Sequence, residues 1–457
     1  MPKIVKRKKK PSLDITDIDQ GELNDRLRRL ETLWQFVVEP PEEWIKEGSE
    51  SSVNKIDLIE CENYSSLLNA WEEAMQWTEG LDHALSVMLA SITSTLSLGD
   101  QLWVKVLAPA ASGKSTLCEA LSANTKYVMA KSTIRGFHSG FGDGDEDHSL
   151  VSRLNGKTLI IKDGDTLLQS PNLSQILSEA RDIYDTVSRT SYRNKNSRDY
   201  TGIRCTILLC GTSSLRALDS SELGERFLDC VMMDGICDDM EDAVLQRVAK
   251  KARANLCLES GDALESQDHP DMLRAKALTG GYIDYLRRNA TSLLKSCEFS
   301  EKRLNRCARF AKLVAYMRAR PSTMQTVDAE RECAYRLASQ FIRLANCLGV
   351  VFNRSEVDDD ILKRTRRVAL DTARGPVMEM THVMYEHGEE GIEPSVLAKL
   401  TTIRDSDVRG LLRFLRKIKV VEPFEAVSKG KSDGRHTRKV KWKLTDQLTR
   451  LYEEVME

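Results

Sequence analysis

The chain has 457 residues and is close to neutral, with 67 lysine and arginine residues against 69 aspartate and glutamate residues. This length has room for about two to four domains, each with its own core. The longest uncharged run, from Ala84 to Gly99, is too short and too rich in serine and threonine to span a bilayer, so we expect no membrane partner. The basic start is not followed by an apolar stretch, so we expect no secretory signal.

Charge and cysteine content indicate a reducing compartment and an attraction to nucleic acid. Basic residues crowd the first ten positions, with no acidic residue among them, which predicts a disordered basic tail over residues 1–13. A nuclear import signal is the weaker interpretation of this run. The eleven cysteines are scattered singly, without a C-x-x-C pair. We therefore expect a cytoplasmic protein, or a nuclear or host-cell protein if the source is eukaryotic or viral.

A helical N-terminal region is predicted over residues 14–79. Apolar residues recur at spacings of three and four from Leu23 to Val37, and the Pro40-Pro41 pair ends this first amphipathic helix. A second helix is predicted from Tyr64 to Trp77, with its apolar residues on one side. This region precedes the main domain.

Short apolar runs alternate with helical patterns from Gly80 onward, which predicts an α/β domain with a parallel sheet over residues 80–238. Helices are expected after the first strand, from Leu173 to Tyr184 and from Leu215 to Leu218. The candidate strands are Trp103 to Leu107, Tyr127 to Ala130, Thr158 to Ile161, Thr206 to Cys210 and Leu228 to Met232.

The remaining chain is predicted to be helical over residues 239–373 and to form a compact domain over residues 374–457. The long periodic stretches are Asp239 to Leu258, Ala277 to Leu294, Glu301 to Ala319, Ala329 to Leu348 and Asp358 to Thr372. The last domain has three expected helices, Val377 to Tyr385, Pro394 to Leu400 and Asp405 to Lys417, and then two strands joined by a basic turn. That order is typical of a winged helix-turn-helix.

The segment from Leu102 to Thr116 has the order of strand, tight turn and helix that a phosphate-binding loop requires. It departs from G-x-x-x-x-G-K-[ST] at Ala108, which stands where the first glycine is expected. We expect the loop to keep its shape if this position needs no positive φ angle. ATP is the predicted ligand, with Lys114 on its β- and γ-phosphates and Ser115 as a ligand of Mg²⁺. The other phosphate-binding candidates are Ala111, Ser112, Gly113 and Thr116.

An acidic residue on a neighbouring strand must hold the magnesium ion and polarise the attacking water. The strand from Thr158 to Ile161 leads into Lys162-Asp163-Gly164-Asp165 and is the best candidate. The usual Asp-Glu pair is absent, because Gly164 follows Asp163. Two interpretations stay open. Asp163 holds the metal and Asp165 polarises the water, or Lys162 and Asp163 occupy the places of the pair and Asp163 is the base.

The order of these motifs resembles an AAA+ ATPase over roughly residues 80 to 371, with Thr212 at the end of a later strand and Gly224-Glu225-Arg226-Phe227 beyond it. The branch that it is similar to includes the minichromosome maintenance helicases and the helicase-like ATPases of phages and mobile elements. The resemblance implies that residues 239–373 form a helical lid. It also implies that Thr212 senses the γ-phosphate, that Arg226 reaches a neighbouring subunit's ATP as a finger, and that Arg336 is the second sensor arginine.

Two basic regions are candidate nucleic-acid contacts. Basic and aromatic residues interleave from Arg189 to Arg204, which suits a β-hairpin that grips a phosphate backbone, although a solvated hairpin has the same pattern. In the helicases that the chain resembles, an insertion hairpin here points into the central channel. The third C-terminal helix and the wing could straddle a duplex through its phosphates, while some winged helices bind proteins instead. The candidates are Arg189, Arg193, Lys195, Arg198, Arg409, Arg413, Lys429, Lys431, Arg435, Arg438, Lys439 and Lys441.

Together these features predict an ATP-dependent DNA motor, a replicative or mobile-element helicase-type ATPase that acts as a ring, expected to be a hexamer. Its expected partners are DNA, further copies of itself and other replication proteins. One alternative is a helicase loader or adaptor that uses ATP as a switch. Another is a DNA-binding regulator with a degenerate nucleotide site, which Ala108 and Gly164 keep open.

Overall fold

The computed structural model describes residues 56–95, 97–139, 147–191, 197–220, 226–232, 245, 269–320, 333–429 and 436–457. Only the backbone is described at residues 191, 197–198, 219–220, 425–429 and 436–439. The predicted basic tail, the first N-terminal helix and nearly all of the helix expected at Asp239 to Leu258 lie outside these residues.

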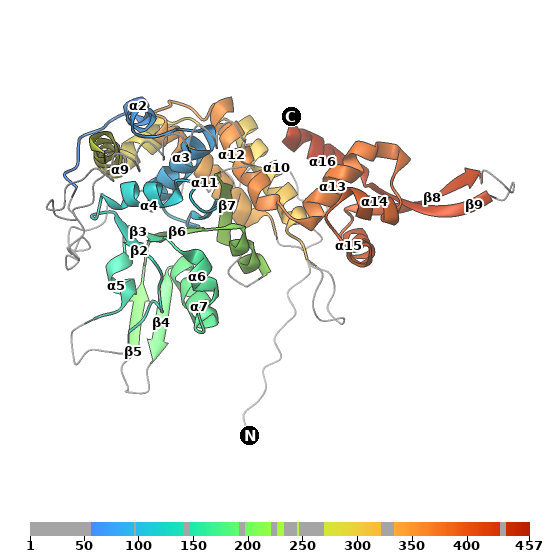
Figure 1. Ribbon diagram of the computed structural model, residues 1–457, viewed down its shortest axis with the longest axis horizontal. Coiled ribbons are helices and arrows are strands. Elements are labelled where there is room, and N and C mark those ends of the chain that lie inside the picture. The colour runs from blue at the N-terminus through green and yellow to red at the C-terminus, as the bar shows by residue number, and fades with distance from the viewer. Residues whose placement is uncertain are drawn as a thin grey trace, which may run out of the picture.

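Five parallel strands form the central sheet: β1 (Trp103–Leu107), β2 (Val128–Lys131), β3 (Lys157–Ile161), β6 (Cys205–Gly211) and β7 (Phe227–Val231). Their order across the sheet is β2-β3-β6-β1-β7 (Figure 1). The α/β class and all five strands are confirmed, with ends that agree to within one residue. Strands β1, β3, β6 and β7 are buried along their whole length, which explains their continuous apolar sequences.

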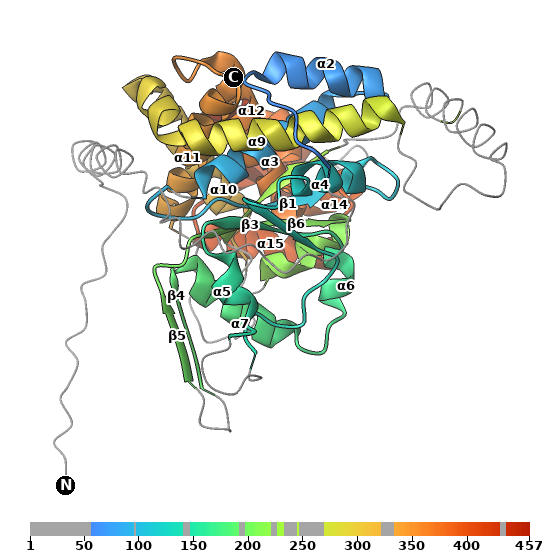
Figure 2. The same cartoon turned by 90° about the vertical axis from the view of Figure 1, so that its left-hand side faces the viewer.

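Helices cover both faces of the sheet and enclose two cores (Figures 1 and 2). One face carries α2 (Tyr64–Ala74), α3 (Glu79–Ser94), α4 (Lys114–Ser122), α9 (Pro270–Ser296), α10 (Glu301–Met317), α11 (Tyr335–Val351) and α12 (Asp359–Ala373). The other carries α5 (Leu150–Leu154), α6 (Gly164–Leu168), α7 (Leu173–Tyr184) and the 3-10 helix η3 (Ser213–Ser220). Because side chains alternate along a strand, β1 contributes Val104 and Val106 to the first core and Trp103 and Leu107 to the second.

Helix α3 was not predicted, because it has no amphipathic pattern. Thirteen of its sixteen residues are buried, since α9, α11 and the sheet surround it. Some of its polar side chains bond within the helix instead of facing water: Ser86 donates to the His83 carbonyl and Thr93 to the Leu89 carbonyl, both at 2.8 Å. A helix buried on all sides loses the periodicity from which helices are predicted.

Helices α9 to α12, predicted as a separate lid, share one core with α3, α4 and the sheet. Helix α12 runs along the outer edge of β7. There the Asp371 carboxylate accepts from the Val231 N–H at 2.8 Å, and the Thr372 hydroxyl accepts from the Asp229 N–H at 2.9 Å. These side chains satisfy the backbone groups of an edge strand. The domain boundary near residue 238 stays a prediction.

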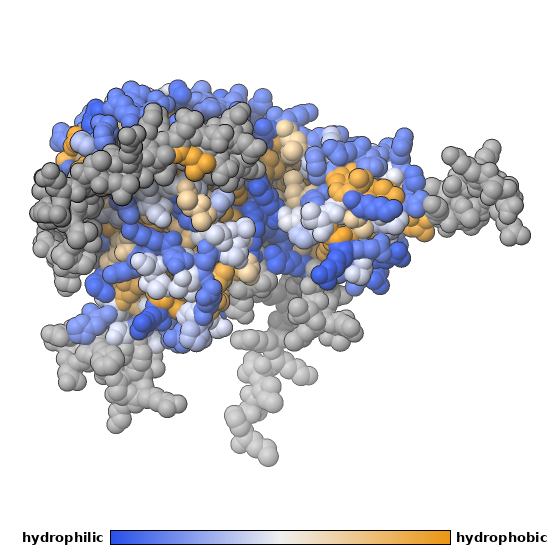
Figure 3. All heavy atoms as spheres, viewed as in Figure 1, coloured by the Kyte–Doolittle hydropathy of each residue, from blue (hydrophilic) through white to orange (hydrophobic). Residues whose placement is uncertain are grey.

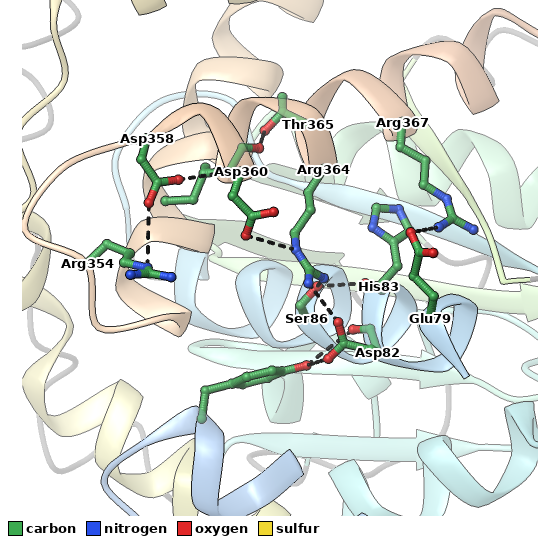
Figure 4. A network of polar contacts seen from close by, with 12 residues as sticks. Glu79, Asp82, His83, Ser86, Arg354, Asp358, Asp360, Arg364, Thr365 and Arg367 are labelled. Carbon is green, nitrogen blue, oxygen red and sulfur yellow. Dashed lines mark hydrogen bonds and ion pairs between the residues drawn. The ribbon is translucent and has the colours of Figure 1, made fainter. Parts of the chain in front are cut away.

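Charged side chains join α12 to the first turns of α3 (Figure 4). Arg364 pairs with Asp82 at 2.8 Å, and Arg367 pairs with Glu79 at 3.5 Å. His83 is buried beside Arg367, and neither ring nitrogen has a hydrogen-bond partner among the described residues. Burial, helped by the charges of Arg367 and Arg364, lowers the pKa of His83 to about 3. This imidazole is therefore neutral near pH 7.

A β-hairpin follows α7 and projects away from the sheet (Figures 1 and 2). It pairs β4 (Val187–Ser191) with β5 (Ser197–Thr201) in antiparallel register, which confirms the predicted hairpin. Thr186 joins α7 to β4 with a φ of 66°, and its carbonyl accepts from the Ile203 N–H at 3.2 Å. Both ends of the hairpin are thus tied together at its base.

The C-terminal part lies at one end of the molecule (Figure 1). It comprises α13 (Pro376–His387), η5 (Gly388–Glu390), α14 (Pro394–Leu400), α15 (Asp405–Lys417), β8 (Val421–Lys429), β9 (His436–Leu444) and α16 (Asp446–Met456). Three α-helices followed by two antiparallel strands were predicted, whereas α16 was not. Helix α16 packs on α10, where Glu454 pairs with Arg309. In the part of the chain described, we find no helix with the length and apolar character needed to cross a membrane.

Candidate functional site

The strand order gathers three loops at one edge of the sheet. Strand β6 lies between β1 and β3, and all three run parallel. Their carboxyl ends therefore meet, and the segments that follow them carry Lys114, Thr212 and Asp165. In α/β folds, ligands bind outside the carboxyl ends of such strands.

The phosphate loop keeps a strained shape without its first glycine. Ala108 is buried, lies outside the positive-φ region and donates its N–H to the Gly211 carbonyl at 3.1 Å. The left-handed backbone occurs instead at Ala111, with φ 62°, and at Gly113, with φ 88°. Alanine at position 108 is thus compatible with the loop, as we expected for a position without positive φ.

Helix α4 begins at Lys114, directly after the left-handed Gly113. The Lys114 ammonium donates to the Ala108 carbonyl at 3.3 Å, so it spans the loop. Ser115 is exposed, and the Ser112 hydroxyl oxygen is buried with no hydrogen-bond partner in the described chain. Unbonded N–H groups and the positive end of the helix attract anions at this point. The loop can therefore receive phosphate groups.

Asp165 and Thr212, predicted as separate site residues, are in contact. The Asp165 carboxylate accepts from the Thr212 N–H at 2.9 Å and from its hydroxyl at 3.0 Å, and it also accepts from the Ser214 hydroxyl. Burial raises the pKa of Asp165, but the hydrogen bonds from Ser214 and Thr212 and the charge of Lys114 lower it to below its ordinary value. Asp165 is therefore ionised near neutral pH and lies close enough to interact with Lys114.

Asp163 is the N-cap of α6. Its carboxylate accepts from the Thr166 N–H at 3.0 Å and also from the Thr166 hydroxyl, and the residue is exposed. Mg²⁺ is commonly held by one or two protein oxygens together with substrate phosphates, and the oxygens of Ser115 and Asp163 suit that role. Among the described residues, no three His, Cys, Asp or Glu side chains form a group that could hold a metal ion.

Close packing at Gly164 accounts for the missing glutamate. A Cβ atom at this position would lie 2.9 Å from side-chain carbons of Leu209 and Leu215, and 3.1 Å from the Cys210 carbonyl oxygen. A side chain here would enter apolar packing beneath the loop, where a carboxylate is costly. The position that follows Asp163 therefore cannot supply a water-polarising acid without rearrangement.

Comparison with known proteins assigns no family to this geometry. No family model matches the chain, and a search of curated proteins also finds no match. The chemistry of the site is therefore inferred from its own side chains.

Three residues beside this site were not predicted. Ser214 follows Thr212 closely in the chain, so the Thr-Ser-Ser run was the signal for it. Met75 and Leu81 lie against the phosphate loop, because a Cβ atom on Gly113 would be 3.2 Å from Leu81 Cδ2 and 3.4 Å from Met75 Cε. These two residues precede the first strand, and no sequence pattern connects them with the loop.

Arg226 and Arg336 lie at the opposite end of the sheet, beside the amino ends of the strands. Both guanidinium groups lie over the Tyr184 ring, 5.3 Å and 6.0 Å from its centre, and that ring packs edge-on against Trp103, the first residue of β1. Five strand residues separate this end of β1 from the phosphate loop, a rise of roughly 16 Å. The structure does not bring Arg336 to the phosphate loop of its own chain, because α11 begins at the amino ends of the strands.

Among the basic candidates of the hairpin, the side chain of Arg189 is the one that the structure describes. Arg189 is exposed and pairs with Asp199 of the facing strand at 3.2 Å. Arg193 and Lys195 lie outside the described residues, and Arg198 is described by its backbone alone.

Helix α15 has an exposed basic face. Arg409 and Arg413 are exposed, with Arg409 paired to Asp405 at 3.1 Å. Lys441 of the wing donates to the Glu390 carbonyl at 3.0 Å. Lys429, Arg438 and Lys439 are described by their backbone alone, and Lys431 and Arg435 lie outside the described residues.

Proposed function

We propose that the chain is an AAA+-type ATPase that works as a ring on DNA. The observation that carries the proposal is the convergence of Lys114, Asp165 and Thr212 at the carboxyl edge of the sheet, beneath a left-handed loop at a helix N-terminus. This set of groups suits the phosphates of ATP.

Lys114 exchanges the Ala108 carbonyl for the β- and γ-phosphates, and its ammonium neutralises charge that develops during phosphoryl transfer. Ser115 and Asp163 would hold Mg²⁺, which would supply further charge neutralisation. Asp165 fixes the position of Thr212, since it accepts hydrogen bonds from the N–H and the hydroxyl of that residue. The hydroxyl exchanges Asp165 for a phosphate oxygen when the nucleotide binds. With Asp163 on the metal, Asp165 polarises the attacking water. If Lys162 and Asp163 instead occupy the places of the usual pair, Asp163 is the base.

Arg226 acts on the ATP of a neighbouring chain. It is separated from its own phosphate loop by the length of β1, so it cannot reach its own nucleotide while the sheet is intact. An arginine supplied from a neighbour couples hydrolysis to assembly. A ring is the closed form of such a head-to-tail contact.

DNA contact is proposed for the hairpin and for the C-terminal part, whose helix order suits a winged helix. The exposed arginines of α15 and the projecting strands β8 and β9 are the expected phosphate contacts. Arg189 is the described candidate in the hairpin, which projects from the main body (Figure 2).

One observation favours a second candidate, a loader or adaptor that uses ATP as a slow switch. The packing around Gly164 excludes an acidic side chain at the position that follows Asp163. Without that acid as a general base, bound ATP is hydrolysed slowly. Fast turnover would exclude this candidate, whereas tight ATP binding with slow turnover would favour it.

The test is the ATPase rate of the full chain with Mg²⁺, with and without single-stranded DNA. Lys114→Ala is expected to lower the rate by about a hundredfold or more, since it removes the cation on the phosphates. Arg226→Ala is expected to lower it by about a thousandfold. An ATPase rate that is unchanged by DNA and by both substitutions would contradict the proposal.

A further inference from the structure

Arg226 is paired with an acidic residue of its own chain. Its guanidinium lies 3.2 Å from the Asp185 carboxylate, and the side chains are 9 % and 57 % exposed, respectively. The Tyr184 ring lies beneath the guanidinium, and Gln340 donates to the Arg226 carbonyl at 2.7 Å. The guanidinium must separate from Asp185 before it reaches a phosphate on another molecule, because Asp185 is its solvent-exposed partner.

Asp185 also lies at the start of the hairpin. It is the C-cap residue of α7, and its N–H donates to the Arg181 carbonyl at 3.1 Å. Thr186 follows in the left-handed region, and β4 begins at the next residue. A change in the position of Asp185 is thus transmitted to the base of the hairpin through two backbone positions.

We propose that Asp185 is a latch that holds Arg226 in the isolated chain and releases it when the ATP of a neighbouring chain takes its place. This inference rests on the proposed function. Release removes the ion pair that fixes the junction between α7 and β4, so the hairpin shifts when the neighbour's site is occupied. Asp185 is a positioning residue, since it acts through Arg226.

In the assembled state, the phosphates of the neighbour's ATP replace Asp185 as the anionic partner of Arg226. Arginine forms bidentate hydrogen bonds with phosphate and with carboxylate, so the two anions compete for the same donors. The latch therefore weakens assembly in the absence of nucleotide and makes hairpin movement depend on ATP.

The experiment measures the ATPase rate of the full chain against protein concentration, with and without oligothymidine. Asp185→Asn is expected to reach its half-maximal rate at a protein concentration lower by about fivefold, which corresponds to an ion pair of about 1 kcal/mol. Stimulation by DNA is expected to fall, because the hairpin no longer responds to Arg226. Asp185→Glu restores both properties because it keeps the charge.

Asp182→Asn is the matched control. Asp182 lies on the same helix, and its charge acts on His138. This variant is expected to retain the concentration dependence and the DNA stimulation of the unmodified chain.

The ion pair itself is tested by a double-mutant cycle in thermal unfolding, and a merely structural pair would leave the concentration dependence and the DNA stimulation unchanged. If the pair exists, Asp185→Asn lowers the melting temperature in the natural chain but not in an Arg226→Ala background. Equal effects in both backgrounds would overturn the latch, as would unchanged concentration dependence and DNA stimulation in Asp185→Asn. If Arg226→Ala is inactive while Asp185→Asn behaves like the natural chain, the latch alone is rejected. If Arg226→Ala is fully active, the proposed role of Arg226 itself is rejected.

Discussion

Two residues set the shape of the phosphate loop, and the irregular Ala108 is not one of them. The backbone turns through the left-handed region at Ala111 and Gly113, while Ala108 contributes a methyl group to the core. An alanine in that region costs about 1–2 kcal/mol, which the rest of the loop must offset. Local strain of this kind is typical of binding sites.

Restoring the motif glycine is expected to bring no gain. Ala108→Gly removes a buried methyl group and increases the freedom of the unfolded chain, so we expect a loss of stability of about 1 kcal/mol. ATP affinity should stay within about a factor of two, because no strain is relieved at this position. Denaturant titration and equilibrium binding check both values. Tenfold tighter ATP binding in Ala108→Gly would show that the loop does need the glycine.

Gly164 is expected to be intolerant of any side chain. Its Cβ would overlap with Leu209 and Leu215, so Gly164→Ala should cost about 1–3 kcal/mol of stability. The matched control is Gly410→Ala, because that glycine lies within α15 with no atom within 4 Å of an added Cβ. The control should stabilise the chain by about 0.5–1 kcal/mol. Urea unfolding of both variants measures the difference, and equal stabilities would refute this account of the packing.

At the scale of elements, α3 is the centre of the helical layer. It packs on β1, β6 and β7 and is covered by α9 and α11. Its first turn lies beside the phosphate loop through Leu81, and the same turn is paired with α12 through Asp82 and Arg364. Movement of α12 relative to the sheet would therefore affect the proposed nucleotide site through this turn.

The buried His83 makes this helix pair sensitive to acid. Below the ordinary histidine pKa of about 6.5 the unfolded chain takes up a proton at His83, whereas the folded chain does so only near pH 3. Stability therefore falls as the pH drops from about 6.5, by about 2 kcal/mol at pH 5 from this group alone.

Unfolding free energies of His83→Leu between pH 7 and 5 check this expectation. Between pH 7 and 5, the stability of the variant should fall with an average slope shallower by roughly 1 kcal/mol per pH unit. His269→Leu is the control, because the His269 side chain is 69 % exposed. Identical slopes for the natural chain and His83→Leu would contradict the assignment of this pH dependence to His83.

Helices and strands could be predicted from the sequence where burial leaves a pattern. Which elements lie side by side in the fold could not be predicted. The apolar runs of β1 and β6 indicated strands, and α7 was predicted at its observed bounds. The insertion of β6 between β1 and β3 depends on pairing between distant segments, which no local pattern records. The contact between Asp165 and Thr212 follows from that order, and the distance of Arg336 from the loop follows from the path of α11.

At the scale of the whole molecule, the proposed site residues lie at two opposite ends of the sheet. Lys114 and Asp165 lie at the carboxyl end, while Arg226 and Arg336 surround Tyr184 at the amino end. In the proposed function, neither end alone holds all the groups needed for hydrolysis. The proposal therefore requires a second copy whose amino end meets the carboxyl end of the first. On the face drawn in Figure 3, much of the described surface is hydrophilic, and apolar residues gather on the C-terminal part.

Mixing two inactive variants tests this central claim most directly. Lys114→Ala cannot hold phosphates but keeps Arg226, and Arg226→Ala has the opposite defect. Each alone should have almost no ATPase activity. An equal mixture should recover activity at about a quarter of the interfaces, the share that random pairing in a closed ring provides. A mixture as inactive as its two components would contradict an ATP site shared between chains.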